Sequence, residues 1–193
     1  VILKTRPYEK EEGQINNLYN KWEKKAIKNV KKGSLRKLRK DIYSIVEEFD
    51  NINLKDIDKP KVGIVGEILV KFHPGANNHL INFLEEEGAE VIVPDLIDFL
   101  LYSSYNSVIK RKLLKDSLFE SILGKIAIKY IEYFRKDLKN ALENSKRFSP
   151  PQAIDKLANK ASEILSLGHQ TGEGWFLTSE MLELLESNVN SIA

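Results

Sequence analysis

Residues able to take part in chemistry gather in two short stretches of the chain. The first stretch follows an apolar run that ends at Gly66, and it contains Glu67 and His73. A carboxylate at the carboxyl end of a parallel strand points into the crevice where α/β proteins hold their ligands. Glu67 is therefore a candidate ligand-binding residue, and a solvated loop carboxylate is the alternative. His73 could donate to a phosphate or polarise a carbonyl, although a lone loop histidine often does neither.

Two asparagines, Asn77 and Asn78, follow in the same loop, directly before an apolar helical pattern. Asparagine is common at the start of a helix, so we interpret both residues first as helix caps. The N–H groups at the same helix start can also hold an anionic group. Both asparagines therefore remain candidate ligand-binding residues.

The second stretch is Gly172-Glu173-Gly174-Trp175, which leads into another apolar helical pattern. Two glycines at a helix start let a ligand approach the backbone N–H groups closely. The alternative is that Trp175 belongs to the core and that the turn is a plain connection. We predict that Glu67 and the turn at 172–175 face the same crevice.

Several kinds of chemistry have no support in this sequence. Gly63 and Gly66 lack the third glycine of a Rossmann dinucleotide fingerprint, so we interpret them as allowing close strand packing and a tight exit. No P-loop and no Ser–His–Asp order is present. The chain contains no cysteine, and its three histidines show no metal-ligand spacing. We therefore predict that this chain supplies no metal ligand.

The elements that must position the two stretches include a strand–loop–helix–strand pattern over residues 61–94. Residues 62–66 and 89–93 are short apolar runs typical of strands buried on both faces, and the segment between them has a helical face that ends at Gly88. Two such strands joined by a helix predict a parallel βαβ crossover. A third strand is predicted at the end of the chain, next to the first one. The predicted fold class is α/β, a Rossmann-like three-layer unit with a short parallel sheet.

The rest of the chain is predicted to be helical. Residues 1–58 form an N-terminal helical extension with two helices, separated at Gly33, and Ser34 caps the second helix. Residues 59–193 form the Rossmann-like domain with a helical insertion. Within it, residues 103–106 are expected to break a helix that begins at Asp95, and residues 149–152 to begin another helix. The domain is expected to be truncated at its C-terminal end, as the amino-terminal part of a longer protein.

Composition and charge limit the kinds of partner that this chain can bind. Hydrophobic residues make up 42% of the chain, which is enough for a core, and the net charge of +2 gives no general attraction to nucleic acid. Residues 21–40 nevertheless hold ten Lys and Arg against one acid, Glu23. Such a run is typical of a solvated helix face, and an anionic partner is the alternative. No apolar run approaches the roughly 20 residues that cross a membrane, and no signal-peptide pattern is present. We expect a cytoplasmic protein without a membrane or nucleic-acid partner.

Three segments of the chain together resemble a known family. They are KTRPYEKEEG at 4–13, residues 61–106 with the motifs GIVGE and NN, and residues 149–192 with the motif GEGWFLTSEM. These segments resemble the 2-hydroxyacyl-CoA dehydratase superfamily, and within it the branch that is associated with, or fused to, the CoA-enzyme activase. The resemblance covers nearly the whole chain.

The resemblance implies Rossmann-like α/β domains, a four-iron four-sulfur cluster held by cysteines, and an ATP-dependent activase that delivers one electron. In the dehydratases themselves, that electron permits a lyase reaction of anaerobic metabolism, which eliminates water from a 2-hydroxyacyl-CoA. This chain has no cysteine, so the cluster ligands are expected in another part of the parent protein and the chain alone is expected to be inert.

The partners implied by the resemblance are an activase-like ATPase, or another subunit of the same system, and an acyl-CoA. The residues that match motifs of the branch are Glu67, Asn77, Asn78, Glu173 and Trp175. Many members of this branch have no known function. The alternative is therefore a non-catalytic scaffold that docks an activase or a cluster-bearing partner, for which the basic residues 21–40 would provide a face.

Overall fold

The computed structural model describes all residues from Val1 to Ala193, and they form two compact units. Unit 1 contains residues 1–59 and 134–151, and unit 2 contains residues 60–133 and 152–193. The predicted domains, 1–58 and 59–193, stay a prediction, because a compact unit is not shown to fold independently.

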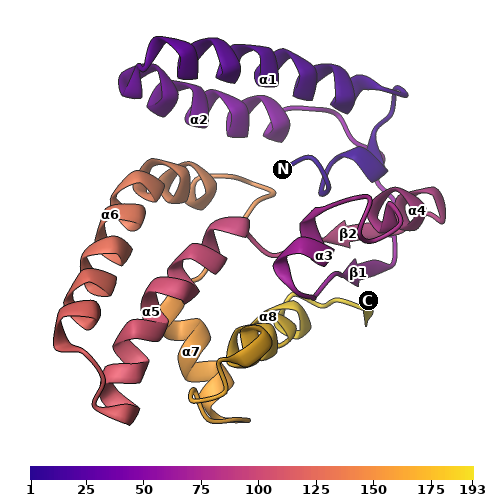
Figure 1. The fold of residues 1–193 in the computed structure, drawn as a ribbon. Helices are drawn as coiled ribbons and strands as arrows, with labels where there is room; N and C mark the ends of the chain where they lie inside the picture. Colours follow the sequence, from indigo (N-terminus) through magenta and orange to yellow (C-terminus); the bar gives the residue numbers. More distant parts are fainter. The chain divides into compact units, whose positions relative to one another are not determined.

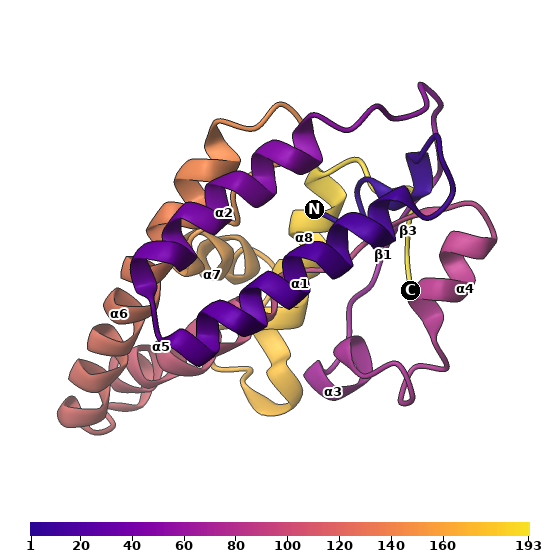
Figure 2. The same ribbon diagram turned by 90° about the horizontal axis from the view of Figure 1, so that it is seen from above.

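Unit 2 contains a small parallel sheet of three strands (Figures 1 and 2). The strands are β1 (Lys61–Gly63), β2 (Glu90–Ile92) and β3 (Ser191–Ile192), in the order β2-β1-β3. Both neighbours of β1 run parallel to it. The predicted strand order and the parallel pairing are confirmed, whereas the chain as a whole is mostly helical.

The helices of unit 2 occupy the connections between these strands. Between β1 and β2 lie α3 (Ile68–Phe72) and α4 (Leu80–Glu86). Between β2 and β3 lie α5 (Leu96–Leu114), the first part of α6 (Leu118–Glu143), α7 (Ile154–Ser162), the 3-10 helix η2 (Thr171–Glu173) and α8 (Gly174–Glu186). The predicted helix start at Asp95 is confirmed, because its Oδ1 accepts a hydrogen bond from the Ile97 N–H at 3.0 Å.

The core of unit 2 forms where α5, α7 and α8 pack together. Its buried residues are Leu101, Tyr102, Ile154, Leu157, Ala158, Ala161, Trp175 and Phe176. Tyr102 stacks on Phe176 with 4.8 Å between ring centroids and meets Trp175 edge to face at 5.1 Å. Aromatic pairs in these arrangements stabilise a core beyond the area that they bury. The beginning of α8 is therefore firmly held.

Unit 1 is built from α1 (Gln14–Lys32), α2 (Leu35–Asp50), the short helix η1 (Arg6–Tyr8) and the last part of α6. Gly33 ends α1 in the left-handed conformation, and Ser34 Oγ accepts from the Lys37 N–H, as predicted. Asp41 joins the two helices, since it accepts from Asn29 and pairs with Lys25 at 2.8 Å. The buried core consists of Ile15, Trp22, Val46, Phe49, Ala141 and Phe148.

Two predicted boundaries are wrong. Residues 103–106 do not break a helix, because α5 runs without interruption from Leu96 to Leu114. The Ser104 hydroxyl donates to the Leu100 carbonyl at 2.9 Å, so this polar residue bonds within the helix. Residues 149–152 do not begin the next helix either. That helix starts at Ile154 without a side-chain cap, and the prolines disfavour helical backbone in the residues that precede them.

Candidate functional site

The loop after β1 contains a short helix, α3, that the sequence did not predict. Glu67 begins this helix, because its Oε2 accepts from the N–H groups of Leu69 at 2.9 Å and Val70 at 3.3 Å. The side chain of Glu67 is exposed. Glu67 thus lies beyond the carboxyl end of β1, as predicted, and its carboxylate caps the helix that follows.

The turn at 172–175 lies beside the start of α3. Glu173 Oε1 accepts a hydrogen bond from the Ile68 N–H at 3.0 Å, and the Glu173 side chain is buried. The two stretches that the sequence singled out are therefore in contact, although 105 positions separate these residues in the chain. That Glu67 and the turn line a common crevice stays a prediction.

Backbone strain accompanies Glu173. Its φ is +65°, in the left-handed region that residues other than glycine rarely occupy. Gly172 has a φ of +62°, and a Cβ on Gly174 would lie 2.0 Å from the His169 carbonyl oxygen. That oxygen accepts from the Trp175 N–H at 2.8 Å. Strain of this kind is often retained where a side chain must be held in one position, and here it directs Glu173 towards α3.

A second contact between α3 and α8 is a buried ion pair. The Lys71 ammonium lies 2.5 Å from Glu180 Oε1, and each side chain is only 1% exposed. A buried charge needs a partner of opposite sign, since the loss of hydration costs several kcal/mol per ion. Glu173 directly precedes α8, and Glu180 belongs to that helix. Each of them contacts α3.

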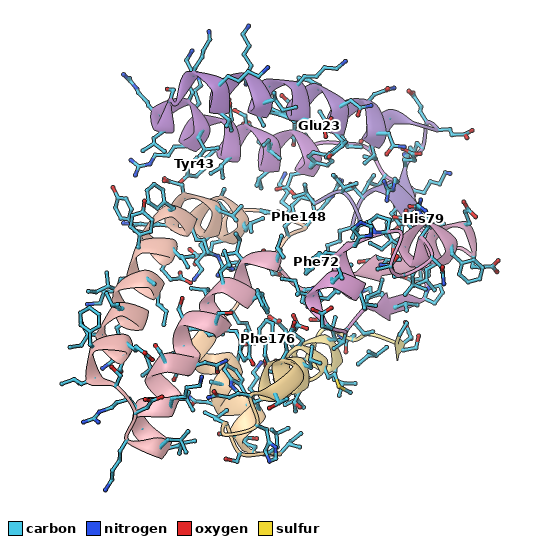
Figure 3. The ribbon with its side chains drawn as sticks, in the orientation of Figure 1. Glu23, Tyr43, Phe72, His79, Phe148 and Phe176 are labelled. Atoms are coloured by element: carbon cyan, nitrogen blue, oxygen red, sulfur yellow. The ribbon has the colours of Figure 1, made fainter.

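Aromatic rings and a further carboxylate surround this pair. The Lys71 ammonium lies 5.1 Å from the ring centroid of Phe72 and 5.6 Å from that of Phe176, both labelled in Figure 3. Asp98 of α5 is also buried, at 3% exposure. The negative charge of Asp98 acts on Glu180.

The pKa of Glu180 is raised to about 7. Burial is the main cause, because it disfavours the charged carboxylate. The hydrogen bond and the charge of Lys71 lower this pKa, while the negative charges of Glu173 and Asp98 raise it. Glu180 therefore changes its protonation state near neutral pH, in the range that suits a group that exchanges protons.

The remaining loop candidates lie around the far end of α3. The asparagines are not the N-cap of α4, which is His79, so their prediction as helix caps is wrong. Asn77 instead connects the two short helices, because its Nδ2 donates to the Val70 carbonyl at 2.9 Å and its Oδ1 accepts from the Leu80 N–H at 3.3 Å. Asn78 is exposed, with a left-handed φ of +54°. His73 ends α3 and is exposed as well. Ligand binding by these three residues stays a prediction.

Trp175 lies in the core. Its side chain is fully buried, and its indole Nε1–H donates to Asn106 Oδ1 at 3.0 Å. The structure thus agrees with the alternative that the sequence left open for Trp175. Of the two glycines in the GIVGE motif, only Gly63 is closely packed, since a Cβ there would lie 2.6 Å from Leu184 Cδ1 and a Cβ on Gly66 would meet nothing within 4 Å.

Lys71 and Glu180 were not predicted from the sequence as residues of the site. Both are charged residues inside apolar segments, ILVKF and FLTSEML, and this placement is the signal that could have found them. A charged residue in such a segment is buried only when it is paired.

The basic residues 21–40 belong to α1, α2 and the turn between them, and most are exposed. Three of the ten basic side chains form ion pairs within unit 1: Lys21 with Glu48, Lys25 with Asp41 and Arg39 with Asp137. No group of three or more His, Cys, Asp or Glu side chains is arranged to hold a metal ion. None of the helices combines the length and the apolar character that a membrane-spanning segment requires.

Comparison of the chain with protein-family models, with curated proteins and with solved structures found no match. The resemblance to the dehydratase superfamily therefore stays a prediction.

The first prediction concerns the turn before α8. We expect Gly172→Ala to lower the free energy of unfolding by about 1–2 kcal/mol, the cost of a left-handed alanine. Gly174→Ala should cost more, because its Cβ cannot lie 2.0 Å from a carbonyl oxygen and the turn must open. Chemical denaturation of the two variants checks this. Equal losses would contradict the close approach at Gly174.

The second prediction concerns the buried ion pair. At pH 8, Lys71→Met should lower the free energy of unfolding by about 3–5 kcal/mol, because it leaves the Glu180 carboxylate buried without its cation. Lys71→Met combined with Glu180→Met should cost much less, since two apolar side chains replace the pair. Urea unfolding of both variants is the measurement. A double variant as unstable as the single one would contradict this prediction, because the loss would then not come from an unpaired Glu180 carboxylate.

The third prediction is a pH dependence. The pKa of Glu180 is about 7 in the folded protein against a usual value of 4.5, so the folded state binds this proton more tightly. The resulting stabilisation is complete below about pH 4.5 and is lost as the pH rises to about 7. It amounts to about 3 kcal/mol.

To isolate this contribution, unfolding of the wild type and of Glu180→Gln is followed from pH 5 to pH 8. The free energy of unfolding of the wild type, relative to the variant, should fall over this range. A constant difference between the two proteins would contradict the raised pKa.

Proposed function

We propose that this chain is part of a 2-hydroxyacyl-CoA dehydratase-like, activase-associated protein, and that unit 2 is its Rossmann-like α/β portion. The observation that carries the proposal is the hydrogen bond from the Ile68 N–H to Glu173 Oε1. It joins GEGW to Ile68, the residue that directly follows GIVGE, and these are two of the motifs on which the resemblance rests. They meet beyond the carboxyl end of the central strand of a parallel sheet, where α/β proteins bind ligands.

The arrangement provides two kinds of groups for a ligand. Glu67 is exposed, and its carboxylate has acceptor capacity beyond the bonds that cap α3. Behind it, Glu173, Lys71 and Glu180 form a buried set of charges that includes a carboxyl group titrating near neutral pH. In the proposal, a polar ligand binds at Glu67, which caps the short helix whose Lys71 pairs with the titrating carboxyl group of Glu180. Such a combination is typical of a reaction site.

The iron–sulfur cluster that the resemblance implies does not fit this chain. Cluster iron is held by cysteine thiolates, and the chain contains no cysteine. In the proposal, cluster ligands come from another segment of the parent protein or from a partner. The role of this chain is to contribute one wall of the ligand site.

The second candidate function is a scaffold that docks an activase-like ATPase or a cluster-bearing partner. The exposed basic face of α1 and α2 favours it, because seven of the ten basic residues in 21–40 form no ion pair in unit 1. Charges of one sign on a surface steer a partner of opposite charge. The two candidates differ in whether the parent protein binds an acyl-CoA.

The fourth prediction tests the cluster assignment. After anaerobic reconstitution with iron and sulfide, this chain should show no iron–sulfur absorbance, because it has no thiolate. The full-length protein that contains it should show that absorbance. A cluster on this chain, or none on the full-length protein, would overturn the proposal.

The fifth prediction separates enzyme from scaffold. Calorimetry of the full-length protein should detect acyl-CoA binding, and Glu67→Gln should weaken it about tenfold, because one charged ligand contact is lost. Glu86→Gln, at an exposed glutamate of α4, is the matched control and should bind as the wild type does. No acyl-CoA binding, together with tight binding of an activase-like ATPase, would favour the scaffold.

A further inference from the structure

Two buried carboxylate oxygens between α3 and α8 have no hydrogen-bond partner in the protein. They are Oε2 of Glu173 and Oε2 of Glu180. Glu173 is 8% exposed and Glu180 is 1% exposed, so bulk water does not serve either oxygen. Buried polar atoms in proteins are nearly always paired, with protein groups or with a bound molecule. Two unpaired acceptors, one directly before α8 and one within it, therefore point to a ligand.

The two oxygens belong to side chains that reach the same short helix. The other carboxylate oxygen of each glutamate is bonded. Glu173 Oε1 accepts from the Ile68 N–H at 3.0 Å, and Glu180 Oε1 accepts from the Lys71 ammonium at 2.5 Å. Ile68 and Lys71 are three positions apart, which is about one turn of α3, and the charge of Glu173 acts on Glu180. Both unpaired oxygens thus lie at the α3–α8 interface.

The charge of this interface limits the ligand. An anion is excluded because it would approach two carboxylates. A metal ion is unfavourable, since the Lys71 ammonium already occupies one carboxylate and fewer than three suitable ligands are present. An apolar group would leave every polar atom unpaired. What fits is a neutral group that both donates and accepts hydrogen bonds.

We propose that the unpaired oxygens of Glu173 and Glu180, with the Lys71 ammonium, bind the hydroxyl oxygen of one neutral ligand at the α3–α8 interface. A water molecule fits this set of groups completely. It donates one hydrogen bond to each of the two oxygens, and it accepts one from an unused N–H of the Lys71 ammonium. The hydroxyl of a small alcohol fits when one carboxyl group carries a proton and donates to it. The raised pKa of Glu180 agrees with this second arrangement.

This site is independent of the proposed function, because it requires neither acyl-CoA nor a cluster. It also accounts for two buried glutamates beside the apolar core of unit 2. The bound hydroxyl would connect Glu173 to Glu180 and give the titrating carboxyl group a path for its proton.

The test is high-resolution diffraction of the wild-type chain together with NMR of its glutamate carboxyl groups. Diffraction should show one solvent oxygen within about 2.7–3.0 Å of both Oε2 atoms. Glu173→Met removes one acceptor while Lys71 and Glu180 keep each other, so this oxygen should disappear. Glu183→Gln, also on α8, is the matched control and should retain it. Should the methionine variant fail to fold, the wild-type density and the titration below decide.

Titration with methanol, the smallest alcohol, distinguishes a bound water from the hydroxyl of an organic ligand. Saturable shifts of the Glu173 and Glu180 carboxyl signals in the wild type would show that an organic hydroxyl enters the site. No shift, with the solvent oxygen in place, would assign the site to water. The proposal is overturned if the wild type shows no solvent oxygen and no methanol response. It is equally overturned if the two carboxyl groups bond directly to each other.

Discussion

The buried ion pair between Lys71 and Glu180 is the interaction on which the site of unit 2 depends. Helix α3 has only five residues, and a helix of that length is unstable by itself. Its position therefore comes from contacts that reach it from outside. Glu180 holds its last turn, Glu173 accepts from the N–H of its first residue, and the Asn77 side chain donates to the Val70 carbonyl. Without these contacts, nothing would fix the loop that follows β1.

The partner helix α8 is rigid for different reasons. Trp175 and Phe176 are fully buried among the aromatic and aliphatic side chains of α5 and α7, and the indole N–H bonds to Asn106. A left-handed Glu173 and the crowded Gly174 then set the direction in which α8 begins. Packing thus compensates for the strain of the turn, and the turn directs a carboxylate to α3. The strained turn and the buried charges therefore both lie where α3 meets α8, and strain and buried charge often occur together at functional sites.

Much of the parallel sheet could be predicted because its signals are local. Short apolar runs at 62–66 and 89–93 mark strands, and their connection leaves few topologies to consider. A common crevice for the two motif stretches stays a prediction, and the hydrogen bond between Ile68 and Glu173 was not predicted. Lys71 and Glu180 are 109 positions apart, and no local pattern connects them. The uninterrupted helix α5 shows the converse, because tertiary packing of Tyr102 overrides a polar segment that is a poor helix former.

Amide hydrogen exchange at Ile68 tests the central claim most directly, namely that α8 holds α3 through buried carboxylates. In the wild type this N–H is bonded to Glu173 Oε1, so it should exchange slowly, although it belongs to the first turn of a short helix. In Glu173→Ala it should exchange at least about tenfold faster, while amides in the core of α5 keep their rates. An Ile68 amide that exchanges at the same rate in both proteins would contradict the account.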